Sequence, residues 1–162
     1  MATQQANAPE RVVEKDLLLV RTFQVPRARV YKAWTDPTLL AQWWGPRGFT
    51  NPVVELDPQH GGAIRIDMTG PDGTLYPMAG TFTEIDPPER LVFTATAIDD
   101  GDGIPQLATL NDISFAEHDG LIRLTVHVTV IKATAAAIPA IEGMDQGWNE
   151  SLDRLGELLA SQ

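Results

Sequence analysis

Apolar and polar residues alternate along the middle of the chain in the way that is typical of β-strands with one buried face. Ile64, Ile66 and Met68 alternate with Arg65 and Asp67, which is the two-residue period of a strand. Strands are expected at about residues 17–25, 51–57, 64–68, 75–85, 91–98, 107–117 and 121–131. Turn sequences such as Pro-Asp-Gly at 71–73 and His-Asp-Gly at 118–120 separate them. The chain is therefore expected to form an antiparallel meander.

The end of the chain has a different pattern, because its apolar residues recur with the 3.6-residue period of an α-helix. The residues that fall within an arc of roughly 80° on a helical wheel are Ile141, Met144, Trp148, Leu152, Leu155 and Leu159. Polar side chains cover the opposite side of this predicted helix. Such a helix must lie on an apolar surface, which the inward faces of the strands supply.

Two short helices are predicted between the first and second strands. Pro26 can open the first helix, and Asp36 with Pro37 forms an N-cap followed by proline at the first helical position of the second. The second helix is expected to end over Trp43, Trp44 and the Gly-Pro sequence at 45–46. Adjacent helical residues cannot face the same way, so at least one of these two tryptophans is expected to plug the end of the sheet.

Composition is consistent with one globular domain and excludes several kinds of partner. A chain of 162 residues with 43% hydrophobic content is expected to form a single domain over 15–162, preceded by a disordered segment at 1–14. Lysine and arginine total 12 against 22 acidic residues, a net charge of -10 that argues against a nucleic-acid partner. No stretch approaches the roughly 18 apolar residues of a membrane span. With no cysteine in the chain, the expected location is the cytoplasm.

Motifs for catalysis, cofactors or metals are not found in the sequence. His60 and His118 lie in predicted turns, and His127 lies on the polar face of a strand. The acidic stretch at 99–103 lacks the pattern of a calcium loop, because Leu110 stands where the twelfth-position glutamate would be needed. We therefore expect no cofactor, no metal site and no recognisable catalytic residue.

A set of short motifs along the chain resembles the family of activators of heat-shock-protein-90 ATPase homologues, a branch of the START-like, Bet v-like (SRPBCC) superfamily. The segments that carry the resemblance are Arg-Thr-Phe at 21–23, Val-Pro-Arg at 25–27, Ala-Trp-Thr-Asp-Pro at 33–37, Trp-Trp-Gly-Pro at 43–46, Gly-Gly at 61–62, Gly-Pro-Asp-Gly at 70–73, Asp-Pro-Pro-Glu-Arg-Leu at 86–91, Gly-Met at 143–144 and Gly-Trp-Asn-Glu-Ser-Leu at 147–152. The resemblance implies an α+β helix-grip fold, in which a curved antiparallel β-sheet wraps around a long C-terminal α-helix. Many relatives have a cavity between the two.

Several inward positions of the predicted sheet and helix hold small or polar residues, which are compatible with such a cavity. Gly80, Ala95, Gly147 and Ser151 either enlarge an internal space or permit close approach of backbones in a filled core. The family often has a large aromatic residue at the position of Ala95. The parity of the strand at 107–117 points Thr109 and Asn111 inward, where Asn111 needs a ligand, water or access to solvent at the sheet edge.

The pocket is predicted from strand parity and the helical face. Its expected lining is Trp43, Phe49, Ile64, Ile66, Met68, Tyr76, Met78, Phe82, Phe93, Ala95, Asn111, Ile113, Leu124, Met144, Trp148 and Leu152.

Three functions are compatible with these features. The favoured one is binding of a small hydrophobic or aromatic molecule. The resemblance also implies a polyketide cyclase- or aromatase-like enzyme, for which Tyr76, Asn111 and Thr109 are the candidates. A chaperone partnership is suggested by the family name alone and is doubtful, because the co-chaperones combine this domain with a separate N-terminal domain. Homodimerisation through a sheet edge or the helix is a further expectation.

Overall fold

An antiparallel sheet of seven strands and a long C-terminal helix make up most of the computed structural model, which describes residues 15–99 and 102–161. The elements in chain order are β1 (Asp16–Phe23), α1 (Arg27–Thr35), α2 (Pro37–Leu40), β2 (Thr50–Leu56), β3 (Ala63–Thr69), β4 (Leu75–Asp86), β5 (Arg90–Asp99), β6 (Pro105–His118), β7 (Leu121–Ala133), the 3₁₀ turn η2 (Ala135–Ala137), α3 (Ile138–Glu142) and α4 (Met144–Ser161). The predicted disordered segment 1–14 lies outside the described residues.

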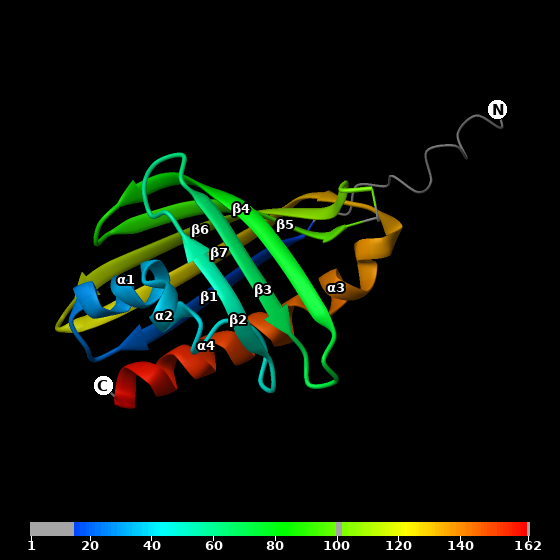
Figure 1. Ribbon diagram of the computed structural model, residues 1–162. Helices are drawn as coiled ribbons and strands as arrows, with labels where there is room; N and C mark the ends of the chain where they lie inside the picture. Colours follow the sequence, from blue (N-terminus) through cyan, green and yellow to red (C-terminus); the bar gives the residue numbers. More distant parts are fainter. Residues whose placement is uncertain (1–14, 100–101, 162) are drawn as a thin grey trace.

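Strands β2 to β7 form a meander, and β1 pairs with β7 as the edge strand on that side. The strand order in the sheet is β1-β7-β6-β5-β4-β3-β2, and every neighbouring pair is antiparallel (Figure 1). The register shifts in the β4–β5 pair between Phe82 and Glu84. Such an irregularity lets Phe82 and Ile85 both pack against the core although they lie three residues apart. The α+β class and the helix-grip arrangement expected from the sequence are thus confirmed.

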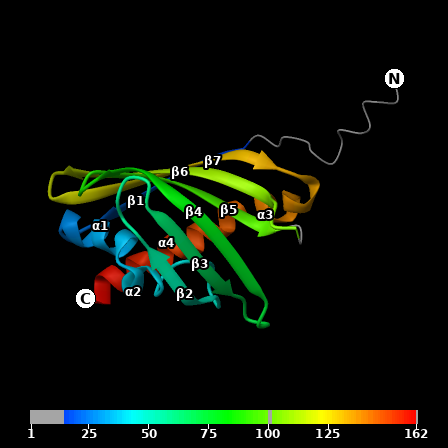
Figure 2. The same cartoon turned by 45° about the horizontal axis from the view of Figure 1, so that its top comes forward.

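Helix α4 lies on the concave face of the sheet, which arches over it (Figure 2). The apolar stripe predicted for this helix is buried at Leu152, Leu155 and Leu159. These side chains join the main core with the inward residues of β6 and β7. Burial of this stripe against the strands holds the helix and the sheet together.

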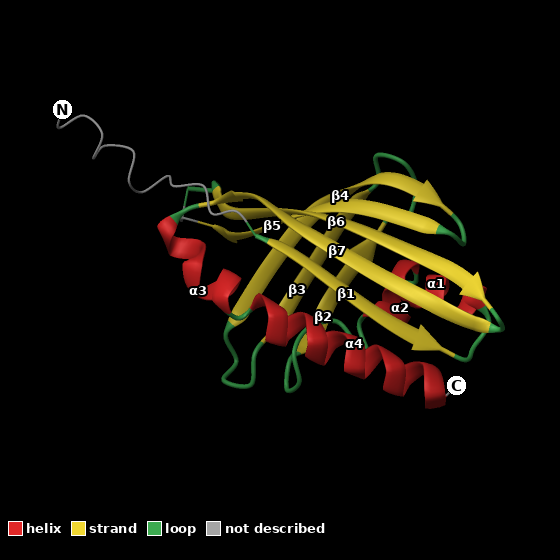
Figure 3. Cartoon of the chain, turned by 180° about the vertical axis from the view of Figure 1, so that it is seen from behind, coloured by secondary structure: helices red, strands yellow, loops and turns green. Residues whose placement is uncertain are grey.

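The helix begins later than its periodicity predicts. Ile141 belongs to α3, not to α4, and the two helices meet at an angle at Gly143 (Figure 3). Pro139, in the first turn of α3, favours the start of a new helix there. Ile141 consequently packs with Leu107 and Val130 in a small separate cluster.

The second short helix has the predicted cap, whereas Pro26 lies at the N-cap position just before α1 and not at its first helical position. Asp36 Oδ1 accepts hydrogen bonds from the backbone N–H groups of Thr38 (2.9 Å) and Leu39 (3.2 Å), and Pro37 takes the first position of α2. Helix α2 ends at Leu40, earlier than the predicted end at 43–46, and a turn carries the chain to the two tryptophans. Helices α1 and α2 thereby cover one end of the concave face.

Four tryptophans fasten this covered end to α4. Trp34 packs on Trp43, with 4.7 Å between ring centroids, and lies nearly parallel to Trp148 at 6.2 Å. Trp44 meets Trp148 edge-on at 5.5 Å. The Nε1–H group of Trp43 donates to the backbone carbonyl of Ala33 (2.9 Å). Trp148 therefore joins the long helix to the aromatic cluster of the short helices.

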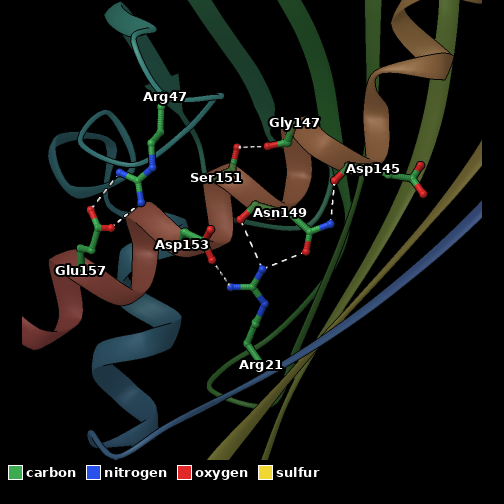
Figure 4. A network of polar contacts seen from close by, with 8 residues as sticks. All are labelled: Arg21, Arg47, Asp145, Gly147, Asn149, Ser151, Asp153 and Glu157. Atoms are coloured by element: carbon green, nitrogen blue, oxygen red, sulfur yellow. Dashed lines mark hydrogen bonds and ion pairs between the residues drawn. The ribbon is translucent and has the colours of Figure 1, made fainter.

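Charged residues fix the position of α4 from both sides (Figure 4). Arg21 of β1 donates to Asp153 (2.7 Å) and to the Asn149 side chain (2.9 Å). On the other side Arg47 pairs with Glu157, and this hydrogen bond and charge hold the pKa of the Glu157 carboxyl below its ordinary value. Such exposed pairs set the helix position more than they stabilise the fold.

Replacing a buried leucine of α4 tests whether the stripe holds the helix in place. Leu152 is fully buried, so we expect Leu152→Ala to lower the free energy of unfolding by about 2–5 kcal/mol through the cavity it leaves. Leu18→Ala is the control, because that side chain is 64% exposed. Urea unfolding of both variants measures the effect, and equal midpoints for Leu152→Ala and wild type would contradict this packing.

Candidate functional site

A cavity of about 420 Å³ lies between α4 and the concave face, away from the end covered by α1 and α2. It is lined by Trp44, Gly45, Pro46, Phe49, Met68, Tyr76, Met78, Phe93, Ala95, Ala97, Leu107, Thr109, Asn111, Val128, Pro139, Ala140, Gly143, Met144, Gly147, Trp148 and Ser151. Strands β3 to β7 form one wall, and α3, α4 and the loop before β2 form the other.

The lining residues differ in how far they are exposed to solvent, so the cavity has an exposed mouth and a buried floor. Tyr76 is 45% exposed, and Pro139, Ala140 and Gly143 are exposed as well. By contrast, Asn111 on β6 is 2% exposed and Val128 on β7 is 1% exposed. The cavity thus opens between β4 and α3 and is deepest at β6 and β7.

The lining is apolar apart from a few neutral groups. Tyr76 is the one ionisable side chain among the lining residues, and it stands at the mouth. Ser151 Oγ donates to the Gly147 carbonyl oxygen within α4 (3.0 Å). The remaining polar side chains are Thr109 and Asn111, both buried. Among residues 15–99 and 102–161, no arginine, lysine, histidine or carboxylate lines the cavity.

Asn111 is held within the sheet and does not reach solvent at an edge. Its Nδ2 group donates to the backbone carbonyl of Phe93 on β5 (3.2 Å) and to Thr109 Oγ1 (3.1 Å). Access to solvent at a sheet edge, one of the alternatives expected for Asn111, is wrong, because β6 is an interior strand with β5 and β7 on either side. The inward direction of Thr109 and Asn111 that strand parity predicts is confirmed.

The small residues divide between the two roles expected for them. Ala95, Gly147 and Ser151 line the cavity and leave space in it. Gly80 instead permits close approach of backbones, because a Cβ atom there would lie 1.9 Å from the Thr94 carbonyl oxygen. Gly45, also in the lining, has a φ of +93°, a backbone conformation that favours glycine.

Part of the predicted lining lies together around this cavity, and part lies elsewhere. Around it lie Phe49, Met68, Tyr76, Met78, Phe93, Ala95, Asn111, Met144 and Trp148. Trp43, Ile64, Ile66, Phe82, Ile113, Leu124 and Leu152 are instead buried in the main core. They face inward as predicted, but α1, α2 and the tryptophans fill the space on their side of the sheet. Strand parity gives the face of a residue and not its place along the strand.

Several residues that line the cavity are not in the predicted lining. Trp44 faces the cavity while its neighbour Trp43 is fully buried, the reverse of the predicted assignment. The helical period predicts that Gly147 and Ser151 line the cavity with Met144, because the three residues lie on the same side of α4. Pro139 and Ala140 carry no such signal, because their position depends on the bend at Gly143.

Arg154 of α4 holds the loop that forms one lip of the cavity. Its Nη1 atom lies 2.9–3.1 Å from the carbonyl oxygens of Trp44, Gly45 and Pro46, and Nη2 donates to the carbonyl of Gln42 (3.2 Å). Burial lowers the pKa of Arg154 from its ordinary value, but an arginine stays charged at neutral pH. The lip is therefore tied to the same helix that forms the cavity wall.

Residues 15–99 and 102–161 form neither a metal-binding cluster nor a membrane-spanning helix. None of their histidine, aspartate and glutamate side chains gather in groups of three or more that could bind a metal ion. None of the helices formed by these residues has the length and apolar character required to cross a bilayer.

Comparison with known proteins identifies relatives of the same shape. The family described as activator of Hsp90 ATPase homolog 1-like protein matches residues 24–160. A crystal structure of a protein from Chromobacterium violaceum is 30% identical, covers 89% of this chain and 96% of its own, and has a TM-score of 0.77. A solution structure of an Arthrobacter aurescens protein is 27% identical over 91% of this chain and 87% of its own, with a TM-score of 0.79.

A third relative has a family name in its description. The AHSA1 protein from Silicibacter pomeroyi is 28% identical, covers 90% of this chain and 98% of its own, and has a TM-score of 0.75. No curated protein matches this chain at a significant level.

Removing the Arg154 contacts tests how the lip is held. We expect Arg154→Met to lower the free energy of unfolding by about 1–3 kcal/mol, since four backbone carbonyls lose a charged donor, and to speed amide hydrogen exchange in residues 42–49. Arg123→Met is the matched control, because Arg123 is exposed on β7. Hydrogen exchange followed by mass spectrometry measures both, and an unchanged rate in 42–49 would show that Arg154 does not hold the lip.

Proposed function

This chain belongs to the family of activator of Hsp90 ATPase homolog 1-like proteins, and from that membership together with its cavity we propose that it binds a small, predominantly apolar molecule between α4 and the sheet. A ligand-binding START-like domain is the general role that the fold of this family supports.

The observation that supports the proposal most directly is the cavity itself. Its volume of about 420 Å³ lies within the roughly 300–1,000 Å³ that is typical of small-molecule sites. The lining is mostly aliphatic and aromatic, and it has a few convergent polar groups, which is the usual composition of such sites. An apolar guest would lose contact with water where it lies against these walls, and this is the driving force for its binding.

Binding has more support in the lining than the alternatives considered from the sequence. An enzyme of the cyclase type would use Tyr76, Thr109 and Asn111, all of which line the cavity. Tyr76 is 45% exposed at the mouth, whereas Thr109 and Asn111 are buried, and this difference favours binding over a reaction that would use all three. The family description by itself suggests a chaperone interaction, whereas the cavity favours a small molecule.

Filling the cavity with a side chain tests this function. Ala95 lines the wall on β5, and Ala95→Phe would place a ring in the cavity. The probe is the neutral fluorophore 6-propionyl-2-dimethylaminonaphthalene, whose emission shifts to the blue in apolar surroundings. We expect it to bind the wild type and its Kd to rise about tenfold or more in Ala95→Phe, since overlap with a ring costs on the order of 1–3 kcal/mol.

Ala116→Phe is the matched control, because Ala116 is exposed near the end of β6 and does not line the cavity. It should bind the fluorophore with the wild-type Kd. Equal affinity of Ala95→Phe and wild type, or no binding to the wild type, would overturn the proposal.

A further inference from the structure

The floor of the cavity indicates the chemical class of its occupant. We propose that the ligand is a neutral apolar molecule that carries a hydroxyl group at its inner end, where the side chains of Asn111 and Thr109 bind that hydroxyl. This inference rests on the proposed function, since it requires that the cavity be a binding site.

The orientation of the Asn111 amide follows from its neighbour on β5. A backbone carbonyl can only accept a hydrogen bond, so the atom 3.2 Å from the Phe93 carbonyl oxygen must be the amide nitrogen. The same nitrogen donates to Thr109 Oγ1. Both hydrogen bonds use Nδ2, and none of the described residues donates to Oδ1 of this 2% exposed side chain. Oδ1 faces the cavity and is not fully enclosed by protein atoms, so it can accept a hydrogen bond from a molecule in the cavity.

Thr109 supplies the complementary group beside it. Its Oγ1 atom accepts the hydrogen bond from Asn111, so the hydroxyl hydrogen of Thr109 is not used in that contact. Thr109 is buried and lines the cavity two residues before Asn111, on the same face of β6. The floor therefore presents one acceptor, Asn111 Oδ1, next to one donor, the Thr109 hydroxyl.

A ligand hydroxyl matches this pair because it donates one hydrogen bond and accepts another. It can donate to Asn111 Oδ1 and accept from Thr109 Oγ1. An ionised group at the floor is disfavoured, because none of the described lining residues carries a charge and a buried unpaired ion is strongly destabilised. Since the polar pair is buried and Tyr76 is at the mouth, the ligand would enter with its hydroxyl leading.

A set of compounds on one ring system tests the inference on the intact chain. The probes are 2-naphthol, 2-methylnaphthalene, 2-methoxynaphthalene and 2-naphthoate, each titrated by calorimetry or tryptophan fluorescence at pH 7. The methoxy compound keeps an acceptor but has no donor for Asn111 Oδ1. The measured quantity is the Kd of 2-methylnaphthalene divided by the Kd of 2-naphthol, compared between wild type and variants, so that the difference in hydrophobicity between the two compounds cancels.

We expect this ratio to fall about tenfold in Asn111→Leu and severalfold in Thr109→Val, because each variant removes one hydrogen bond to the hydroxyl. The Kd of 2-methoxynaphthalene divided by the Kd of 2-naphthol should also fall in Asn111→Leu, because only 2-naphthol can donate to Asn111 Oδ1. 2-Naphthoate should not bind measurably.

Thr109→Val changes the side-chain shape little, so it tests the inference even where Asn111→Leu does not fold. Thr125→Val on β7 is its control, because Thr125 does not line the cavity, and it should keep the wild-type ratio.

The outcomes separate this inference from the proposed function. If none of the neutral compounds binds the wild type, both proposals fail. If 2-naphthol and 2-methylnaphthalene both bind, and the variants at 109 and 111 keep the wild-type ratio, the cavity is a binding site but the inferred hydroxyl recognition is wrong. Binding of 2-naphthoate with the affinity of 2-naphthol would also overturn the inference.

Discussion

The packing of α4 across a curved sheet determines both the stability of this protein and its cavity. A helix cannot follow a concave sheet along its whole length, so large side chains must fill the space at some points and small ones leave it open at others. At one end Trp148 meets Trp34 and Trp44, and the short helices complete a dense core. Towards the other end Gly147 and Gly143 leave the space that becomes the cavity.

The cavity is bounded by groups that are themselves held in place. Arg154 ties the lip over Trp44 to α4, and Arg21 ties α4 to β1 on the other side. Asn111 is fixed by the Phe93 carbonyl of the neighbouring strand. These contacts put apolar walls and a polar floor in place before a ligand arrives, and a site formed in advance loses less free energy to ordering on binding.

Much of the fold could be predicted from local patterns, because those patterns have local causes. Alternation gave the strands, the Asp36-Pro37 pair gave the start of α2, and the apolar stripe gave the C-terminal helix. The cavity lining could be predicted only in part. Parity placed Asn111 and Ile113 on the same inward face, but the first lines the cavity and the second is in the core. That difference depends on how far α1 and α2 extend over the sheet, which is a property of the tertiary structure.

A crystal structure of the protein grown with 2-naphthol tests the central claim most directly. The claim is that α4 and the sheet enclose a site whose walls are apolar and whose floor is Asn111. The account predicts density for the ring between Trp148 and β5, with its hydroxyl within hydrogen-bond distance of Asn111. Density for the compound only on the outer surface, or a helix α4 packed on the sheet with no space between them, would contradict it.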